Sequence, residues 1–338
     1  MKFKINKSKT LLALTILVVV SLLMPAVKLV AQDSSTTVIE GSAVKKVKPV
    51  KNTFQSIWII DNQTVMVPVK GTFEMDIQHR FGSVKKGYQE MWGLFSSSNI
   101  RLGVSYAPIN KLNLGLGVTR TTAVTANMPT PSSVSGPVWD GSLKYALISQ
   151  TPGKYPVSVT YYGNMAYNTK KDTAHEIYRY TSDRLTFFNQ VIIARKITEK
   201  LSIQVAPSLS HQNVVNGYFT QKDSANLLVN PEMNFNHFAI AFGARYKLSD
   251  VTSLMINYDQ PITKHVLHNP APNLSFGLEF NTSSHSFQLF ATNFYYLSPQ
   301  ANNLYNNNSP FSYTDENNNK MQGGQFVIGF NITRLWSY

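Results

Sequence analysis

The clearest period-two alternation in the chain is at residues 100–119, Ile100-Arg-Leu-Gly-Val-Ser-Tyr-Ala-Pro-Ile-Asn-Lys-Leu-Asn-Leu-Gly-Leu-Gly-Val-Thr119. Large apolar side chains take every second position on both sides of the break at residues 108–111. Successive side chains of a β-strand point to opposite faces, so each half predicts a strand with one apolar face. The short break predicts that the two strands form a hairpin.

Segments of the same kind recur from Gly71 to the end of the chain, and they predict twelve strands. We expect these strands at residues 71–80, 100–106, 112–119, 139–149, 155–166, 185–195, 201–210, 237–246, 251–258, 274–280, 285–294 and 326–332. The segment at 185–195 is ambiguous, because Val191-Ile192-Ile193 is apolar on both faces. An even number of short alternating strands is typical of membrane barrels.

The connections between these segments alternate strictly between short and long. Short turns fall at residues 108–111, 151–154, 198–200, 249–250 and 282–284, and long stretches at 81–98, 121–138, 167–184, 212–236, 259–272 and 295–324. Outer-membrane barrels have this asymmetry, whereas a water-soluble β-sandwich does not sort its loops by length. The sequence therefore predicts an all-β fold, a 12-stranded antiparallel transmembrane β-barrel with short periplasmic turns and long external loops, over residues 71–338.

The first 31 residues have the layout of a secretory signal peptide. Basic residues from Lys2 to Lys9 precede an apolar stretch at 11–23, and cleavage is expected after Ala31. Five of the 31 basic residues and none of the 18 acidic ones lie in this segment, so the remainder carries a net charge of +8. The basic excess is not clustered, so we expect no nucleic-acid partner. The absence of cysteine excludes disulfides and Cys-ligated metals.

Residues 32–70 are expected to form a periplasmic linker that contains one apolar piece. Its apolar members are Phe54, Ile57, Trp58, Ile59 and Ile60. They could act as a plug in the mouth or lumen of the barrel, or as an amphipathic tether against its rim. The sequence leaves both readings open.

Charged and polar residues on the non-lipid faces of several strands predict a polar cluster in the lumen. Its members are Glu74, Asp76, Gln78, Arg80, Arg101, Lys144, Arg245 and Glu279. One reading is a solute path lined by charge, as in selective pores. The other reading, which we favour, is ion pairing across a narrow barrel, because an unpaired buried charge is costly.

Motifs for catalysis and metal binding are weak. His265 and His268 have a spacing that could chelate a metal on a helix, but prolines surround them. No His has Ser two positions after it, as an outer-membrane phospholipase would need, and Asp172 with His175 or Asp315 with Glu316 are adjacent polar loop residues without further support. We expect neither an enzyme nor a metal or cofactor site.

Several motifs resemble those of an uncharacterised family of bacterial outer-membrane β-barrels. They read Gly71-Thr-Phe-Glu-Met-Asp-Ile-Gln-His-Arg-Phe-Gly82, Asn99-Ile-Arg-Leu-Gly-Val-Ser-Tyr106, Trp139-Asp-Gly-Ser-Leu-Lys-Tyr145, Pro156-Val-Ser-Val159, His285-Ser-Phe-Gln-Leu-Phe290 and Gly329-Phe-Asn-Ile-Thr-Arg334. The resemblance covers residues 54–335 and implies an outer-membrane barrel without established catalytic or ligand residues. Trp58 departs from it, because a basic residue is expected at that position.

Taken with the export signal, these patterns predict a barrel of the bacterial cell outer membrane. The expected function is a narrow, partly occluded channel or binding barrel for a small solute. The alternatives are a non-conducting structural or docking barrel that acts through its external loops and, less favoured, a surface hydrolase. Expected partners are outer-membrane lipid, the barrel-assembly machinery and the solute.

Overall fold

A computed structural model describes residues 48–120, 136–173, 175, 177–223, 226–314 and 319–337. The predicted signal peptide at residues 1–31, the linker up to residue 47, and Asp315 with Glu316 lie outside the described residues.

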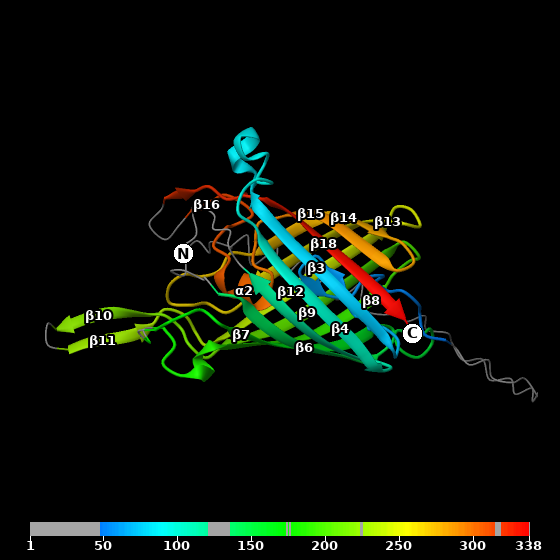
Figure 1. The fold of residues 1–338 in the computed structure, drawn as a ribbon, viewed down its shortest axis with the longest axis horizontal. Helices are drawn as coiled ribbons and strands as arrows, with labels where there is room; N and C mark the ends of the chain where they lie inside the picture. Colours follow the sequence, from blue (N-terminus) through cyan, green and yellow to red (C-terminus); the bar gives the residue numbers. More distant parts are fainter. Residues whose placement is uncertain are drawn as a thin grey trace, which may run out of the picture.

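Twelve strands close into an antiparallel barrel (Figure 1). They are β3 (Thr72–Ser83), β4 (Asn99–Ile109), β5 (Leu112–Arg120), β6 (Val138–Ile148), β7 (Ser158–Asn168), β8 (Leu185–Lys196), β9 (Leu201–Gln212), β12 (Asn236–Lys247), β13 (Thr252–Pro261), β14 (Asn273–Asn281), β15 (His285–Thr292) and β18 (Val327–Ser337). Each pairs with its neighbour along the chain, and β18 pairs with β3 to close the cylinder. The prediction of twelve strands in a closed barrel is confirmed.

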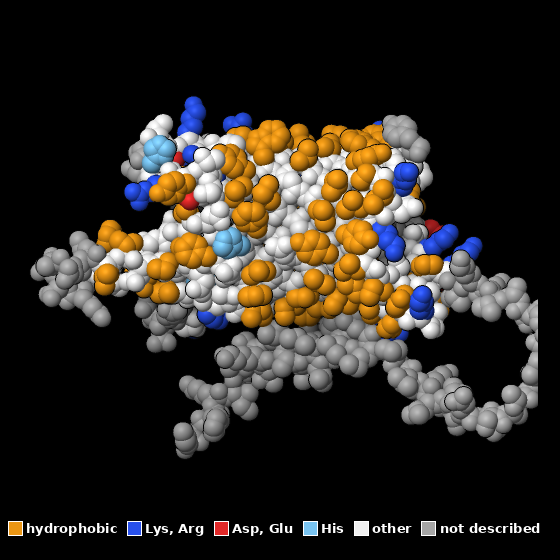
Figure 2. Space-filling view, turned by 90° about the horizontal axis from the view of Figure 1, so that it is seen from below, with side chains coloured by type: hydrophobic (Ala, Val, Ile, Leu, Met, Phe, Trp, Pro, Cys, Tyr) orange, Lys and Arg blue, Asp and Glu red, His pale blue; other side chains and the backbone are white. Residues whose placement is uncertain are grey.

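The two faces of the barrel wall differ in chemistry, as β4 illustrates. Ile100, Leu102 and Val104 are exposed on the outer face, whereas Arg101 between them is 6% exposed and points inward. Figure 2 shows the resulting band of hydrophobic side chains on the face of the barrel that it displays. Wall strands of 8 to 12 residues are close to the roughly 9–11 residues that a tilted strand needs to cross a bilayer.

Short and long connections lie at opposite ends of the barrel. The short ones include residues 110–111 and 282–284, and we call that side the turn end. The long ones include residues 213–235 and 293–326, and we call that side the loop end (left in Figure 1). Both the start of β3 and the end of β18 lie at the turn end.

Several elements outside the wall were not predicted. The loop end carries the 3-10 helices η1 (Val84–Glu90) and η2 (Thr181–Arg184), the hairpin β10 (Gly217–Asp223) with β11 (Asn226–Pro231), α2 (Pro299–Tyr305), and β16 (Tyr313–Thr314) with β17 (Lys320–Met321). The hairpin β1 (Trp58–Ile59) with β2 (Asn62–Gln63) precedes the barrel in the chain. These pieces are too short or too polar to show a clear period. Among the described residues, no helix is both long and apolar enough to cross a membrane.

Candidate functional site in the barrel lumen

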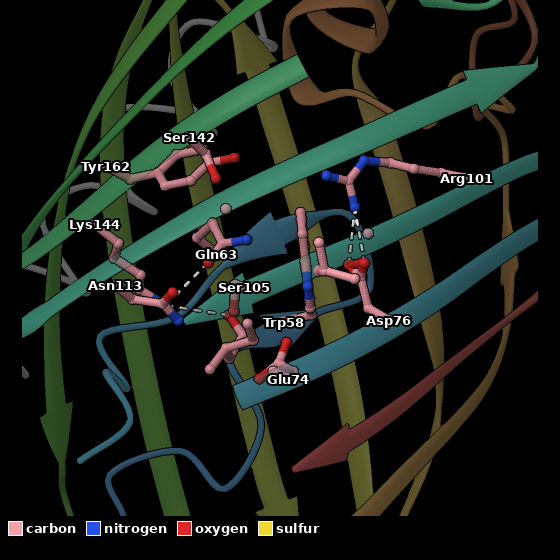
Figure 3. A pocket seen from close by; sticks show the side chains of 14 residues that line it. Trp58, Gln63, Glu74, Asp76, Arg101, Ser105, Asn113, Ser142, Lys144 and Tyr162 are labelled. Carbon is pink, nitrogen blue, oxygen red and sulfur yellow. Dashed lines mark hydrogen bonds and ion pairs between the residues drawn. The ribbon is translucent and has the colours of Figure 1, made fainter. Parts of the chain in front are cut away.

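Residues 53–65, which we call the inner segment, lie inside the barrel and include the β1–β2 hairpin (Figure 3). The predicted plug residues Phe54, Ile57, Trp58, Ile59 and Ile60 are all in it, and none is more than 6% exposed. They therefore lie within the lumen and not as a tether on the rim. Ile60 at the tip of the hairpin has a φ of 63°, which is strained for a β-branched residue.

Wall side chains satisfy the backbone of the inner segment. The Gln288 amide donates to the Trp58 carbonyl (2.8 Å) and accepts from the Ile60 N–H (3.2 Å). The Asn331 amide donates to the Ile60 carbonyl (2.6 Å), and the Gln204 amide donates to the Gln63 carbonyl (3.0 Å). Buried backbone groups need such partners where water is displaced, and polar wall residues supply them here.

The apolar side chains of the inner segment pack into a small hydrophobic cluster inside the lumen. The cluster comprises Phe54, Ile59, Ile60, Val65, Tyr162, Phe188, Ile192, Ala194, Ala206, Ala241, Met255, Phe290 and Phe294. Its wall members include Ile192, which faces inward and is fully buried, while its neighbour Val191 is exposed on the outer face. The two-faced apolar stretch in β8 is thus explained, because one face meets lipid and the other meets the inner segment.

Arg101 lies at the centre of a buried ion triad next to the inner segment. Its Nη1 lies 2.8 Å from Asp76 Oδ1, and its Nε and Nη2 donate to the two oxygens of Asp140 at 3.0 and 2.8 Å. A Cβ at Gly103 or Gly117 would overlap the ends of these side chains, so a larger residue at either position would displace the triad. Asp140 was not among the predicted lumen residues, although its alternation with Trp139 places it on the same face as Lys144.

The other predicted lumen residues fall into separate groups. Arg245 Nε lies 2.5 Å from Glu279 Oε2. The Nη2 of Arg245 also contacts the side chain of Gln55, a residue of the inner segment. Lys144 Nζ donates to Gln63 Oε1 (3.0 Å) and to the Ile57 carbonyl (3.4 Å). These charges therefore hold either each other or the inner segment.

The remaining three predicted lumen residues, all on β3, form no ion pair with any residue that the structure describes. Arg80 is fully buried, donates from Nη1 to Asn331 Oδ1 (3.0 Å), and lies with its guanidinium 4.5 Å from the Phe290 ring centre. Glu74 and Gln78 are buried, and each has one polar atom without a hydrogen-bond partner. The eight predicted residues thus all line the lumen without forming one continuous charged path.

A cage of amides joins the inner segment to α2, and sequence reasoning missed it. Asn302 on α2 donates to Asp61 Oδ2 (3.2 Å) at the tip of the inner segment. Asn257 lies between two carboxylates and donates to Asp61 Oδ1 (3.2 Å) and Asp259 Oδ1 (3.1 Å). Asn62 also donates to Asp259 (2.8 Å). Isolated Asn residues on strands and in an Asn-rich loop carry no pattern that predicts such a meeting.

Little space remains beside the inner segment. A cavity of about 30 Å³ lies between Trp58, Gln63, Glu74, Lys144 and the wall (Figure 3). Such a volume holds about one water molecule. The Trp58 ring centre lies 5.6 Å from the Arg101 guanidinium carbon. Trp58 thus contacts a cation at the position where the family resemblance leads one to expect a basic residue. The lumen at this level is filled by protein.

The residues considered for metal binding and catalysis are used within the loops. His265 Nε2 lies 2.8 Å from His237 Nδ1, whereas His268 contacts Glu232, so the two histidines considered for chelation face different partners. The Asp172 carboxylate accepts the backbone N–H groups of residues 177 and 178. In the part of the chain that the structure describes, no group of three His, Asp or Glu is placed to hold a metal ion.

Comparisons with solved structures return outer-membrane proteins at low similarity. The NanC porin shares 9% identity, with 79% of this chain and 99% of that chain covered and a TM-score of 0.42. The KdgM porin shares 7% identity (78% and 99% covered, TM-score 0.41), and an outer membrane channel from Pseudomonas putida F1 shares 12% (80% and 97% covered, TM-score 0.40). No curated protein matches the chain.

One family model matches residues 54–336. The match covers the inner segment except for its first residue, and the twelve wall strands except for the last residue of β18. The resemblance noted in the sequence is thereby confirmed, and the protein is membrane-bound. The chain belongs to the family described as a membrane bound beta barrel domain (DUF5777).

Proposed function

We propose that this protein is an outer-membrane barrel for passage or binding of a small solute, and that the inner segment keeps its lumen closed until it is displaced. The observation that carries the proposal is the way the inner segment is held. Within the described part of the chain, its two strands pair only with each other, and side chains of the wall, not strand ladders, bind it. The segment is therefore removable without breaking any backbone pairing of the cylinder.

The wall behind the inner segment is suited to an open state. Gln204, Gln288, Asn331 and Lys144 bind the inner segment now and would face the lumen if it left. All four are polar, so water or a polar solute can replace the contacts that they lose. In this proposal the loop end is external, residues 1–31 direct export, and the barrel-assembly machinery inserts the chain.

Single-channel recording in planar bilayers tests the proposal. Deletion of residues 49–66 should convert a closed or rarely opening barrel into one with a steady conductance. A matched control replaces residues 217–231, the β10–β11 hairpin, by a short Gly-Ser linker, because this hairpin makes its strand pairs outside the barrel wall. The control should stay closed.

A crosslink makes the same test reversible. The chain has no cysteine, so the double variant Gln63→Cys with Lys144→Cys offers one defined pair at positions whose side chains now contact each other. A short, cleavable bifunctional thiol reagent should abolish openings, and cleavage should restore them.

Absence of conductance in both the full chain and the deletion variant would rule out passage. The non-conducting docking barrel, which acts through its external loops, would then replace it. A surface hydrolase would instead require lipid or peptide hydrolysis that is lost on replacement of His175 or Asp172.

A further inference from the structure

A second and larger cavity, which we call the vestibule, lies at the loop end of the barrel. Its volume is about 230 Å³, and it is bounded by α2, by the connection 169–184 with η2, and by the connection 213–235. The ends of β5 to β9 complete its wall.

Most of the vestibule wall is apolar or aromatic. Ala166, Met233 and Leu304 are buried there, and the rings of Tyr296 and Tyr305 meet edge to face with centroids 6.3 Å apart. An engineered apolar cavity of about 150 Å³ is large enough to bind benzene. The vestibule therefore has room for a substituted aromatic ring, and its wall offers such a ring apolar contact.

Two buried glutamines each carry one polar atom that has no hydrogen-bond partner among the described residues. The Tyr305 hydroxyl donates to Gln212 Oε1, which orients that amide and leaves its Nε2 without an acceptor. The Gln300 amide donates to Asn164 Oδ1 (2.7 Å), which leaves its Oε1 without a donor. Both glutamines line the vestibule and are 2% exposed. An unsatisfied buried polar group is unfavourable, so a bound molecule that pairs with both would be favoured.

The charged side chains of the vestibule wall have partners already. Asp140 belongs to the Arg101 triad, and the Asp183 carboxylate accepts the Tyr180 N–H (2.8 Å). Arg184 donates to the carbonyls of Asn168 and Lys170, and its guanidinium lies 4.5 Å from the Tyr178 ring centre. Lys170 also has an interaction of its own. These contacts favour an uncharged ligand over an ionised one.

We propose that the vestibule binds a small, neutral, amphipathic molecule that consists of one substituted aromatic ring and a hydroxyl or primary amide group. The ring packs on the apolar wall, and the polar group accepts from Gln212 Nε2 and donates to Gln300 Oε1. The inference rests on the proposed function in one respect, since it names the class of solute that the barrel would take up. Binding in the vestibule does not itself require passage.

Titration of the protein in lipid nanodiscs tests this assignment. The probes are phenol and benzamide, with toluene as the matched ring that lacks a polar group. The readout is the methyl signal of Met233 in methionine-labelled protein, which the variant Met233→Leu identifies. We expect phenol or benzamide to shift this signal saturably and toluene to bind at least tenfold more weakly.

Two variants attack the site in different ways. Gln300→Leu keeps the size of the side chain and removes the acceptor, so affinity for the polar probes should fall at least tenfold. Ala301→Phe fills the vestibule from α2 and should abolish binding of every probe. Gln260→Leu is the control, because it makes the same change on β13 at a residue that does not line the vestibule, and it should bind like the original protein. Heat-modifiable gel mobility reports whether each variant is folded.

Three results would overturn the proposal. They are no saturable shift with phenol or benzamide, equal affinity for toluene and phenol, or binding that survives Ala301→Phe in folded protein. Conductance is measured separately on the deletion variant, so the two proposals fail independently. Saturable vestibule binding in a barrel that never conducts would support the ligand site and refute passage.

Discussion

The inner segment and α2 occupy the same lumen from opposite ends, but different chemistry holds them. The inner segment places Ile59 and Ile60 in an apolar cluster and has its backbone bound by wall amides. Helix α2 is held by side-chain amides, among them Gln300 with Asn164 and Asn302 with Asp61. The inner segment would lose its apolar burial and its backbone partners together, whereas the amide contacts of α2, although buried, are made by separate side chains and can be lost one at a time. We therefore expect α2 to loosen before the inner segment does.

The largest expected effect concerns the ion triad next to the inner segment. Arg101→Met leaves Asp76 and Asp140 buried without their cation, which should lower the free energy of unfolding by about 3–5 kcal/mol. Denaturant unfolding of the folded protein in detergent measures it. Lys247→Met is the control, because its partner Asp250 is exposed, and stability should hardly change. Similar losses in both variants would mean that the triad contributes no more than a surface pair.

A second prediction distinguishes the hydrogen bonds that hold the inner segment from those that hold α2. Gln288→Leu leaves the Ile60 N–H and the Trp58 carbonyl without partners, at a cost of about 1–3 kcal/mol for each group. Hydrogen exchange of residues 54–65 should then accelerate at least tenfold. Asn302→Leu should accelerate exchange in α2 and leave residues 54–65 nearly unchanged.

Gln78→Leu is the matched control for the variants Gln288→Leu and Asn302→Leu. Gln78 is a buried wall glutamine whose Nε2 has no hydrogen-bond partner, so its replacement should alter neither element. The comparison between the two anchors would be wrong if Asn302→Leu released the inner segment as strongly as Gln288→Leu.

The smallest effect is a pH dependence near α2. His265 accepts the Asn234 N–H at Nδ1 (2.9 Å) and contacts His237 through Nε2, while the Ala271 N–H donates to the carbonyl of Asn306 at the end of α2. Burial, with a smaller contribution from Lys264, lowers the pKa of His265 below its ordinary value of 6.5. The hydrogen bond that the neutral His265 ring accepts from the Asn234 N–H therefore stabilises the loop fully above pH 6.5. This stabilisation is lost as the pH falls through the lowered pKa of His265.

Hydrogen exchange of residues 262–269, corrected for its intrinsic pH dependence, measures this effect between pH 7 and pH 4. We expect faster exchange at the acidic end, no such change in residues 54–65, and a smaller change in His265→Gln. An unchanged loop across this range would contradict the assigned histidine contacts.

The sequence allowed the wall to be predicted well and the contents of the lumen less well. Alternation alone places Arg101 inward and Leu102 outward, because successive side chains of a strand point to opposite faces of the sheet. The partner of Arg101 depends on barrel register, which sets Asp140 opposite Gly117 and Gly117 opposite Gly103. That register is a property of the closed sheet, so Asp76 and Arg101 were predicted as lumen residues and Asp140 was not.

The inner elements were harder to predict because their local sequence is not periodic. The apolar piece at 54–60 suggested two placements, and only the inward apolar residues Phe188 and Ile192 distinguish between them. α2 begins at Pro299, and the hydroxyl of its N-cap, Ser298, accepts the Ala301 N–H. The helix is only seven residues long and lies in an Asn-rich loop. Its position depends on tertiary contacts with the wall and the inner segment.

Gly103 and Gly117 are cross-strand neighbours, and their bare backbone forms a shallow notch in the wall. The guanidinium of Arg101 fits into this notch with both of its carboxylate partners and so lies along the wall. A longer residue at either glycine would push that charge toward the barrel axis. The notch thus lets three charged groups share one level of a narrow tube while they lie against its wall, with the Trp58 ring beside the guanidinium.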